Sequence, residues 1–281
     1  MRKLDLHCYP GTPEWVRSQG PFAAALAEYW NKPWDGRPEQ DVVDDIRAAG
    51  MQALLVAFDI ESIHENSPAF QNQEVAAMRD RHPDVFVGAW GAVDPFKGEA
   101  ALVEIERTAR EDGVLGLHFH PIMGRYRVDS PELRPIFELM RDLGLVAMVD
   151  VGTTGMGAGL PGGLGSRIDN AHPIAIDHLA ADLPELTIIA SHPGWPWVEE
   201  MTAVALHKGN VFWELSGWAP KYFSPQLKVD IRSRLQDKIM FGTDHPSIPF
   251  DRLFREWDEL GYSDDVMAKV FHGNAERVLG V

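Results

Sequence analysis

The chain has 281 residues, of which 45% are hydrophobic and 24% charged, which is the balance of an ordinary globular protein. A formal net charge of −16 argues against a nucleic-acid partner, and no apolar run approaches the roughly 20 residues of a membrane-spanning helix. A barrel of alternating strands and helices needs roughly 250 residues, so we expect one domain over residues 1–281.

The N-terminal residues and the cysteine content both indicate the cellular compartment. Residues 1–7 enter a strand-like segment at once and lack the apolar stretch of a signal peptide. The single cysteine, Cys8, excludes an internal disulfide framework and suits a reducing compartment. We therefore expect a cytoplasmic protein.

Short apolar runs alternate with longer amphipathic stretches along the chain, and this pattern predicts eight strand–helix units. The predicted strands are 3–7, 53–58, 85–90, 115–119, 145–150, 186–191, 210–215 and 238–242, and the clearest predicted helices are 40–49, 97–112 and 131–143. Such alternation is typical of a parallel sheet, and eight units can close into a (β/α)8 barrel of the α/β class. An open doubly wound sheet is the alternative, but the first helix is not opened by a GxGxxG motif.

A glycine-dense segment, about 152–167, follows the predicted fifth strand and has no hydrophobic period. In a barrel this position lies at the catalytic end, where long loops act as lids or binding walls. We expect a lid there, with an ordinary surface loop as the alternative.

Side chains that bind metal ions occur where the predicted strands end. Asp5 and His7 are two residues apart on the first strand, so both project from one face, and His118 and His120 repeat that spacing on the fourth. The other three are Asp150 at the end of the fifth strand, His192 after the sixth and Asp244 after the eighth.

Carboxylate and imidazole groups together suit a divalent ion with an open position for water or substrate. So many ionisable groups at one barrel end would be costly to bury without a cation. The alternatives are a turn or capping role for Asp5 and Asp244, and packing or loop hydrogen bonding for one of His118 and His120. Asp150 leaves both roles open as well.

Tryptophans gather beside the same strand ends, and Trp90, Trp195 and Trp218 are candidate walls for an aromatic substrate. Ordinary core packing is the alternative for each of them. Arg125, in the loop after His120, is a candidate for binding a carboxylate or phosphate, although loop arginines usually face water.

At these motifs the chain resembles the amidohydrolase superfamily, in particular the amidohydrolase-related branch that includes aminocarboxymuconate-semialdehyde decarboxylase and γ-resorcylate decarboxylase. The motifs are Asp5-Leu6-His7, Gly116 to Pro121, Val149 to Thr153, Ile189 to Gly194, Phe241 to Pro246 and the closing Gly273 to Arg277. The resemblance spans nearly the whole chain and implies an amidohydrolase-like barrel.

The resemblance also implies site roles. It assigns the binding of one divalent ion to Asp5, His7 and Asp244, with Asp150 at the fifth-strand position, and it makes His192 the catalytic acid or base, aided by Asp244. Two departures matter: Tyr9 stands where many relatives have a second histidine, and Asp150 stands where they have histidine. An oxygen-rich set favours zinc or manganese, a contribution from His118 and His120 is the alternative, and loss of the metal is a third possibility.

The chain looks most like members known as 4-hydroxyphenyl-β-ketoacyl-CoA hydrolases, which implies hydrolysis of a carbon–carbon, ester or lactone bond in an aromatic or acyl-CoA-type substrate during degradation of aromatic compounds. Non-oxidative decarboxylation of a hydroxylated aromatic acid is one alternative. A catalytically degenerate barrel that only binds ligand is another. Relatives are often dimers, so a homodimer is compatible with the resemblance.

Overall fold

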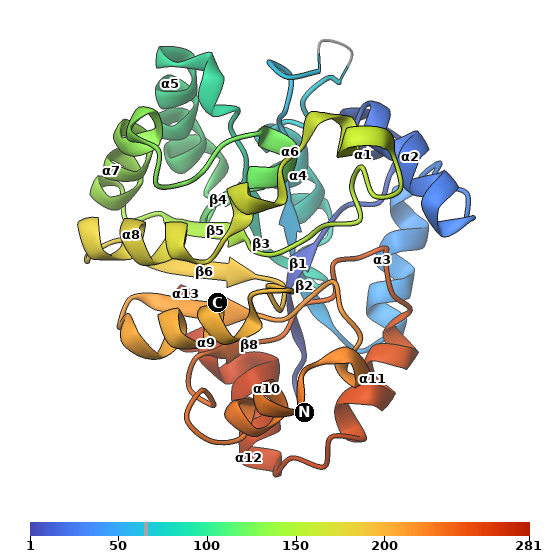
Figure 1. Cartoon of the computed structure of the whole chain (residues 1–281). Coiled ribbons are helices and arrows are strands. Elements are labelled where there is room, and N and C mark those ends of the chain that lie inside the picture. Colours follow the sequence, from blue (N-terminus) through green and yellow to red (C-terminus); the bar gives the residue numbers. More distant parts are fainter. Residues whose placement is uncertain (65–66) are drawn as a thin grey trace.

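Eight parallel strands form the centre of the molecule (Figure 1), in a computed structural model that describes residues 1–64 and 67–281. The strands pair in chain order, from β1 to β8. Their bounds are Leu4–Cys8 (β1), Gln52–Val56 (β2), Phe86–Gly91 (β3), Gly116–Phe119 (β4), Val146–Asp150 (β5), Ile188–Ser191 (β6), Val211–Glu214 (β7) and Ile239–Met240 (β8). Backbone hydrogen bonds from Leu6 to Phe241 (3.2 Å) and from Asp244 to His7 (2.8 Å) join the two ends of the sheet. The predicted (β/α)8 barrel is confirmed.

Helices surround the strands (Figure 1). They are α1 (Pro13–Ser18), α2 (Pro21–Trp30), α3 (Glu39–Ala48), α4 (Asn72–Arg81), α5 (Glu99–Arg107), α6 (Pro121–Gly124), α7 (Arg134–Asp142), α8 (Ile174–Asp182), α9 (Val198–His207), α10 (Pro225–Ile231), α11 (Phe250–Asp258), α12 (Asp264–Ala268) and α13 (Asn274–Leu279). Among the residues described, none of these helices is long and apolar enough to cross a membrane.

Most predicted boundaries differ from the observed ones by one or two residues. The helix expected over 97–112 is interrupted, because Gly98 has a φ of 59° between a 3-10 turn at Pro95–Lys97 and α5, and its last turn is a π-helix at Thr108–Asp112. The helix expected over 131–143 begins as a 3-10 turn, and β8 is shorter than 238–242. These differences lie at the ends of elements, where helices fray and end turns often have 3-10 geometry.

Two segments without regular strand structure rise over one end of the barrel. The first connects β1 to α3 and carries the short helices α1 and α2. The second is the glycine-rich segment 152–167. The sequence predicts a loop there, and the structure adds a 3-10 turn at Pro161–Gly165. The two segments meet where Gly155 faces Leu26 and Trp30.

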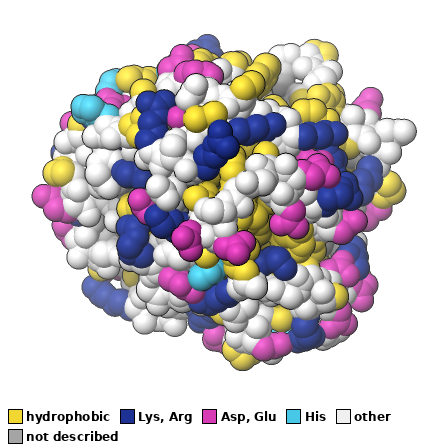
Figure 2. Space-filling view, turned by 90° about the horizontal axis from the view of Figure 1, so that it is seen from below, with side chains coloured by type: hydrophobic (Ala, Val, Ile, Leu, Met, Phe, Trp, Pro, Cys, Tyr) yellow, Lys and Arg dark blue, Asp and Glu magenta, His cyan; other side chains and the backbone are white. Residues whose placement is uncertain are grey.

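Charged side chains of both signs are interspersed over the face of the molecule in Figure 2, with hydrophobic side chains between them. On that face the described Lys and Arg side chains alternate with Asp and Glu. On this face the acidic side chains are therefore not gathered into one patch.

Candidate active site

Asp5 lies inside β1 and fastens the first strand to the loop after the last. Its carboxylate accepts hydrogen bonds from the backbone N–H of His7 (3.0 Å), the backbone N–H of Thr243 (2.8 Å) and the hydroxyl of Thr243 (2.6 Å). Burial raises the pKa of Asp5 to about 7, although these hydrogen bonds act in the opposite direction. Asp5 thus positions both His7 and the loop that carries Asp244.

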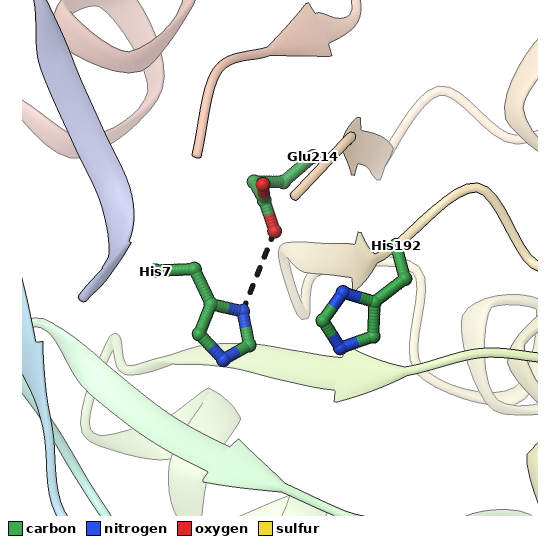
Figure 3. Close-up of side chains that lie close together, drawn as sticks. All are labelled: His7, His192 and Glu214. Carbon is green, nitrogen blue, oxygen red and sulfur yellow. Dashed lines mark ion pairs between the residues drawn. The ribbon is translucent and has the colours of Figure 1, made fainter. Parts of the chain in front are cut away.

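The imidazole of His7 lies between two carboxylates, one from the end of β7 and one from the loop after β8. Its Nδ1 is 3.4 Å from Oε2 of Glu214, and its Nε2 is 3.9 Å from Oδ1 of Asp244. Figure 3 shows His7 pointing toward Glu214 beside the ring of His192, with which it stacks at 5.1 Å between centroids. Neither ring nitrogen has a hydrogen-bond partner among the described residues. Burial lowers the pKa of His7 to about 3, so the ring is neutral and has a lone pair for a cation.

Asp150 ends β5 and is surrounded by three histidines. Its Oδ1 lies 2.9 Å from Nε2 of His118 and 3.5 Å from Nε2 of His192, while its Oδ2 lies 3.5 Å from Nε2 of His120. Burial acts to raise the pKa of Asp150, but the three imidazoles outweigh it and hold that pKa well below its usual range. Asp150 is therefore a carboxylate at neutral pH.

His192 is held by a short hydrogen-bonded chain from β7. Its Nδ1 is 3.1 Å from Oγ of Ser216 and 3.2 Å from the backbone oxygen of Ser216, and the Ser216 hydroxyl donates to Oε2 of Glu214 (2.9 Å). Burial alone would lower the pKa of His192, but Asp150, Asp244 and Glu214 raise it to about 10. The ring is therefore an imidazolium at neutral pH, with Nε2 directed toward Asp150.

The backbone is strained at both predicted catalytic residues. His192 has a φ of 74° and Asp244 a φ of 57°, a region that residues other than glycine rarely adopt. Gly217 leaves room for them, because a Cβ there would lie 2.8 Å from Nδ1 of His192 and 3.2 Å from Oδ2 of Asp244. The loops after β6, β7 and β8 are thus shaped around these two side chains.

Two carboxyl groups near His7 ionise close to neutral pH. Burial raises the pKa of Asp244 to about 6, with His192 and His7 acting in the opposite direction. Burial likewise raises the pKa of Glu214 to about 7. A cation among these groups would stabilise their charged forms.

Two sets of side chains bring their ligand atoms within 4.8 Å of one another: His7, His192 and Glu214 form one, and His7, His118 and Asp150 form the other. His7 belongs to both. Two further buried atoms, Oδ2 of Asp150 and Oε1 of Glu214, accept no hydrogen bond from residues 1–64 or 67–281 and so add lone pairs to these sets. This donor set fits a divalent ion. A ligand role for Asp5 stays a prediction, since both its oxygens already accept hydrogen bonds.

A cavity of about 110 Å³ opens beside these groups. Its polar floor is His120, Asp150, His192 and Asp244. Its walls come from the β1–α3 connection, the 152–167 segment and the loops after β2, β7 and β8, and include Tyr9, Trp15, Gln19, Leu26, Trp30, Trp34, Phe58, Met123, Thr153, Thr154, Gly155, Met156, Gly217, Trp218, Pro246 and Ser247. The lid predicted at 152–167 therefore contributes a wall.

Not every predicted substrate contact lines this cavity. Trp218 and His120 do, and His118 lies beneath them against Asp150. Trp90 is fully buried and donates its indole N–H to the carbonyl of Leu6 (2.8 Å), so it is a core residue.

Two others lie outside the cavity lining. Trp195 is 54% exposed, although its ring lies 6.2 Å from that of Trp218. Arg125 is exposed and donates to the carbonyl of Leu164, so it ties down the lid rather than facing the cavity.

Glu214 and Ser216 were not among the predicted site residues. Glu214 ends β7 and falls within the predicted strand 210–215, so the rule that selected Asp150, an acidic residue at a strand end, would have found it. Ser216 carries no comparable signal, because a serine after a strand is common. The aromatic residues between β1 and α3 were also missed, since no predicted element covered them.

A sequence model of the amidohydrolase family matches residues 5–281. The chain belongs to the amidohydrolase family. A comparison with curated protein sequences gave no match.

Several solved structures share the fold of this amidohydrolase. An uncharacterized TIM-barrel protein from Bordetella bronchiseptica is 22% identical with a TM-score of 0.79, covering 100% of this chain and 99% of its own. A 5-carboxyvanillate decarboxylase from Novosphingobium aromaticivorans with bound manganese is 19% identical with a TM-score of 0.72, covering 100% and 97%. A probable 2-pyrone-4,6-dicarboxylic acid hydrolase from Acinetobacter baumannii is 12% identical with a TM-score of 0.67, covering 100% and 100%.

Proposed function

We propose that this amidohydrolase hydrolyses a carbon–carbon bond next to a carbonyl group in a small aromatic-derived substrate such as an aryl β-ketoacyl thioester. The observation that carries the proposal is that His192 and Asp244 lie together at the floor of one cavity. The pKa of His192 is raised to about 10 and that of Asp244 lies at about 6. At neutral pH one is therefore an acid and the other a base, which is the arrangement that acid–base catalysis requires.

The bond changes follow from these two groups. Asp244 accepts a proton from a water molecule as its oxygen adds to the substrate carbonyl carbon. The carbon–carbon bond then breaks, its electron pair stays with the departing carbon, and His192 donates a proton to that carbon. The products are an aryl carboxylic acid and the shortened acyl compound, and proton transfer from Asp244 to His192 restores the starting state.

The residues that would hold a divalent ion are His7, Asp150 and Asp244, with His118 within reach, and either zinc or manganese suits this mixture of nitrogen and oxygen donors. When bound, the ion supplies Lewis-acid stabilisation of negative charge on the substrate oxygen. Oε2 of Glu214 lies 3.4 Å from Nδ1 of His7, close enough for its charge to favour one orientation of the ring, a role that carboxylates commonly have beside metal-binding histidines.

A second candidate function is non-oxidative decarboxylation of a hydroxylated aromatic acid. It is favoured by the protonated state of His192, because protonation of a ring carbon needs an acid at this position and no base. The 5-carboxyvanillate decarboxylase with the same fold belongs to this reaction class.

The test combines a metal determination with a substrate panel. Purified protein is analysed for bound zinc and manganese and is incubated with aryl β-keto thioesters and with hydroxybenzoates, and aryl acid and carbon dioxide are quantified separately. We expect bound metal and release of an aryl acid. Carbon dioxide from hydroxybenzoates alone would establish the second candidate, and a metal-free protein without turnover, even after addition of either ion, would support a barrel that only binds ligand.

The variant His192→Asn tests the role of His192 as the acid. Loss of a positioned acid should lower turnover by about 10²- to 10⁴-fold. The matched control is His178→Asn, because His178 is exposed in α8, pairs with Asp129 (2.8 Å) and is not among the residues that line the cavity. Equal turnover in wild type and His192→Asn would overturn the assignment.

A further inference from the structure

A row of aromatic side chains leads from the metal-binding groups to the surface. Tyr9 stacks on Trp15 with 5.0 Å between ring centroids, Trp15 lies 6.0 Å from Trp34, and Trp34 lies 5.3 Å from Trp30. Tyr9 is itself 5.0 Å from the ring of His7. Trp30 is 38% exposed, whereas the others are buried, so the row runs outward from the site.

The row is held in place by neighbours, so it forms a preorganised wall. The indole of Trp34 donates to the side-chain oxygen of Gln19 (2.7 Å), which fixes its orientation. Gly155 of the lid faces Trp30 so closely that a Cβ there would lie 3.3 Å from the indole. A planar ring entering between this wall and the lid would meet aromatic faces and edges, which are favourable contacts for another aromatic ring.

The acidic and histidine side chains around the cavity lie at its floor. Among the residues that line it, as far as the structure describes them, there is no lysine or arginine, and the acidic and histidine side chains are Asp150, Asp244, His120 and His192. All four lie at the floor, where a bound divalent ion would supply positive charge. An anion along the aromatic wall would therefore lose hydration without gaining a cationic partner.

Arg125 illustrates this point. It is the one arginine among the predicted site residues, and its guanidinium donates to the carbonyl of Leu164 instead of lining the cavity. Other lid contacts come from uncharged residues, Thr153, Thr154 and Met156.

We infer that the cavity accepts a single aromatic ring with at most one anionic group, held at the floor, and that it rejects aromatic dicarboxylates. This inference rests on the proposed function only in taking the cavity as the substrate site. It separates this chain from proteins of the same fold whose substrates carry two carboxyl groups, such as the probable 2-pyrone-4,6-dicarboxylic acid hydrolase.

The test measures the binding of three probe molecules to the metal-loaded protein by calorimetry, and it does not depend on turnover. The probes are 4-methylbenzoate, terephthalate, which replaces the methyl group by a second carboxylate, and cyclohexanecarboxylate, which removes the aromatic character. We expect terephthalate to bind at least about tenfold more weakly than 4-methylbenzoate, and cyclohexanecarboxylate several-fold more weakly. Equal or tighter binding of terephthalate would overturn the inference.

Two variants test whether the residues of the cavity wall determine this binding preference. Met156→Lys places a cation on a half-exposed wall residue and should shift the ratio of terephthalate affinity to 4-methylbenzoate affinity at least about fivefold toward terephthalate. Trp30→Ala should weaken 4-methylbenzoate about three- to tenfold. The matched control is Phe96→Ala, an exposed aromatic residue outside the cavity lining. If Met156→Lys does not favour terephthalate, the absence of positive charge along the wall does not determine selectivity.

Failure of this inference and failure of the proposed function give different results. Terephthalate binding as tightly as 4-methylbenzoate, together with a large loss of turnover in His192→Asn, contradicts the inference alone. The expected binding preference without any hydrolysis or decarboxylation contradicts the proposed function alone.

Discussion

Oε2 of Glu214 lies 3.4 Å from Nδ1 of His7, and both side chains are fully buried. The two residues lie far apart in the chain, on β7 and β1, and Figure 3 shows their side chains pointing toward each other. Gly242 makes room for this contact, because a Cβ there would lie 2.1 Å from Oε1 of Glu214. A carboxylate on one nitrogen of His7 leaves the other nitrogen for a cation.

The first prediction concerns this contact. Glu214→Gln keeps the size of the side chain but removes its charge, so His7 is oriented less firmly and the metal ion should bind about 10- to 100-fold more weakly. Titration with a chelator measures the change. Glu256→Gln is the matched control, because Glu256 is also buried but pairs with Arg252 (2.9 Å) near the surface. Equal metal affinity in Glu214→Gln and wild type would show that this carboxylate does not support the ion.

The second prediction concerns Ser216, which links Glu214 to Nδ1 of His192. Ser216→Ala removes the hydroxyl, so His192 loses one of the groups that fix its orientation. We expect kcat to fall about tenfold, the equivalent of about 1.4 kcal/mol and typical of one hydrogen bond, with little change in KM.

Ser216→Thr keeps the hydroxyl and should restore most of kcat. A purely structural role would instead change both kinetic constants or the thermal stability, and threonine would give no rescue of kcat.

The third prediction is a dependence of stability on pH. The folded-state pKa of His192 is about 10, above the ordinary value of 6.5, so the folded protein binds this proton more tightly than the unfolded chain. The resulting stabilisation is complete below pH 6.5 and is lost as pH rises through about 10, each unit of the shift being worth about 1.4 kcal/mol. Chelator-treated protein should therefore show a clear fall in Tm between pH 7 and pH 10.

The comparison with His192→Asn isolates this residue from other alkaline effects. The fall in Tm over the same interval should be distinctly smaller in the variant. Parallel curves for the two proteins would mean that the imidazolium of His192 does not contribute to stability.

The fourth prediction concerns the link between β1 and the loop after β8. Thr243→Val removes the hydroxyl that donates to Oδ2 of Asp5 (2.6 Å) and leaves a buried carboxylate with one donor fewer. Such a loss costs about 1–3 kcal/mol in the free energy of unfolding, measured by denaturant titration. Metal affinity should fall as well, since Asp5 positions His7. An unchanged free energy of unfolding would contradict a structural role for this hydrogen bond.

The order of strands and helices could be predicted from the sequence because it depends on local patterns. Apolar runs of strand length, separated by amphipathic stretches with glycine at their ends, specify alternating units, and a parallel sheet of such units has one edge where all strands end. That geometry alone predicts that His7, Asp150, His192 and Asp244 converge, whichever residues lie between them.

The functions of individual side chains at that edge were decided by the tertiary structure. Asp5 and His7 share one face of β1, yet both oxygens of Asp5 accept hydrogen bonds from Thr243. The imidazole of His7, by contrast, has no hydrogen-bond partner in the part of the chain that the structure describes. Trp90 and Trp218 both lie near strand ends, yet one packs in the core and the other lines the cavity. Hydrogen-bond partners and burial depend on residues more than two hundred positions away, and no local pattern encodes them.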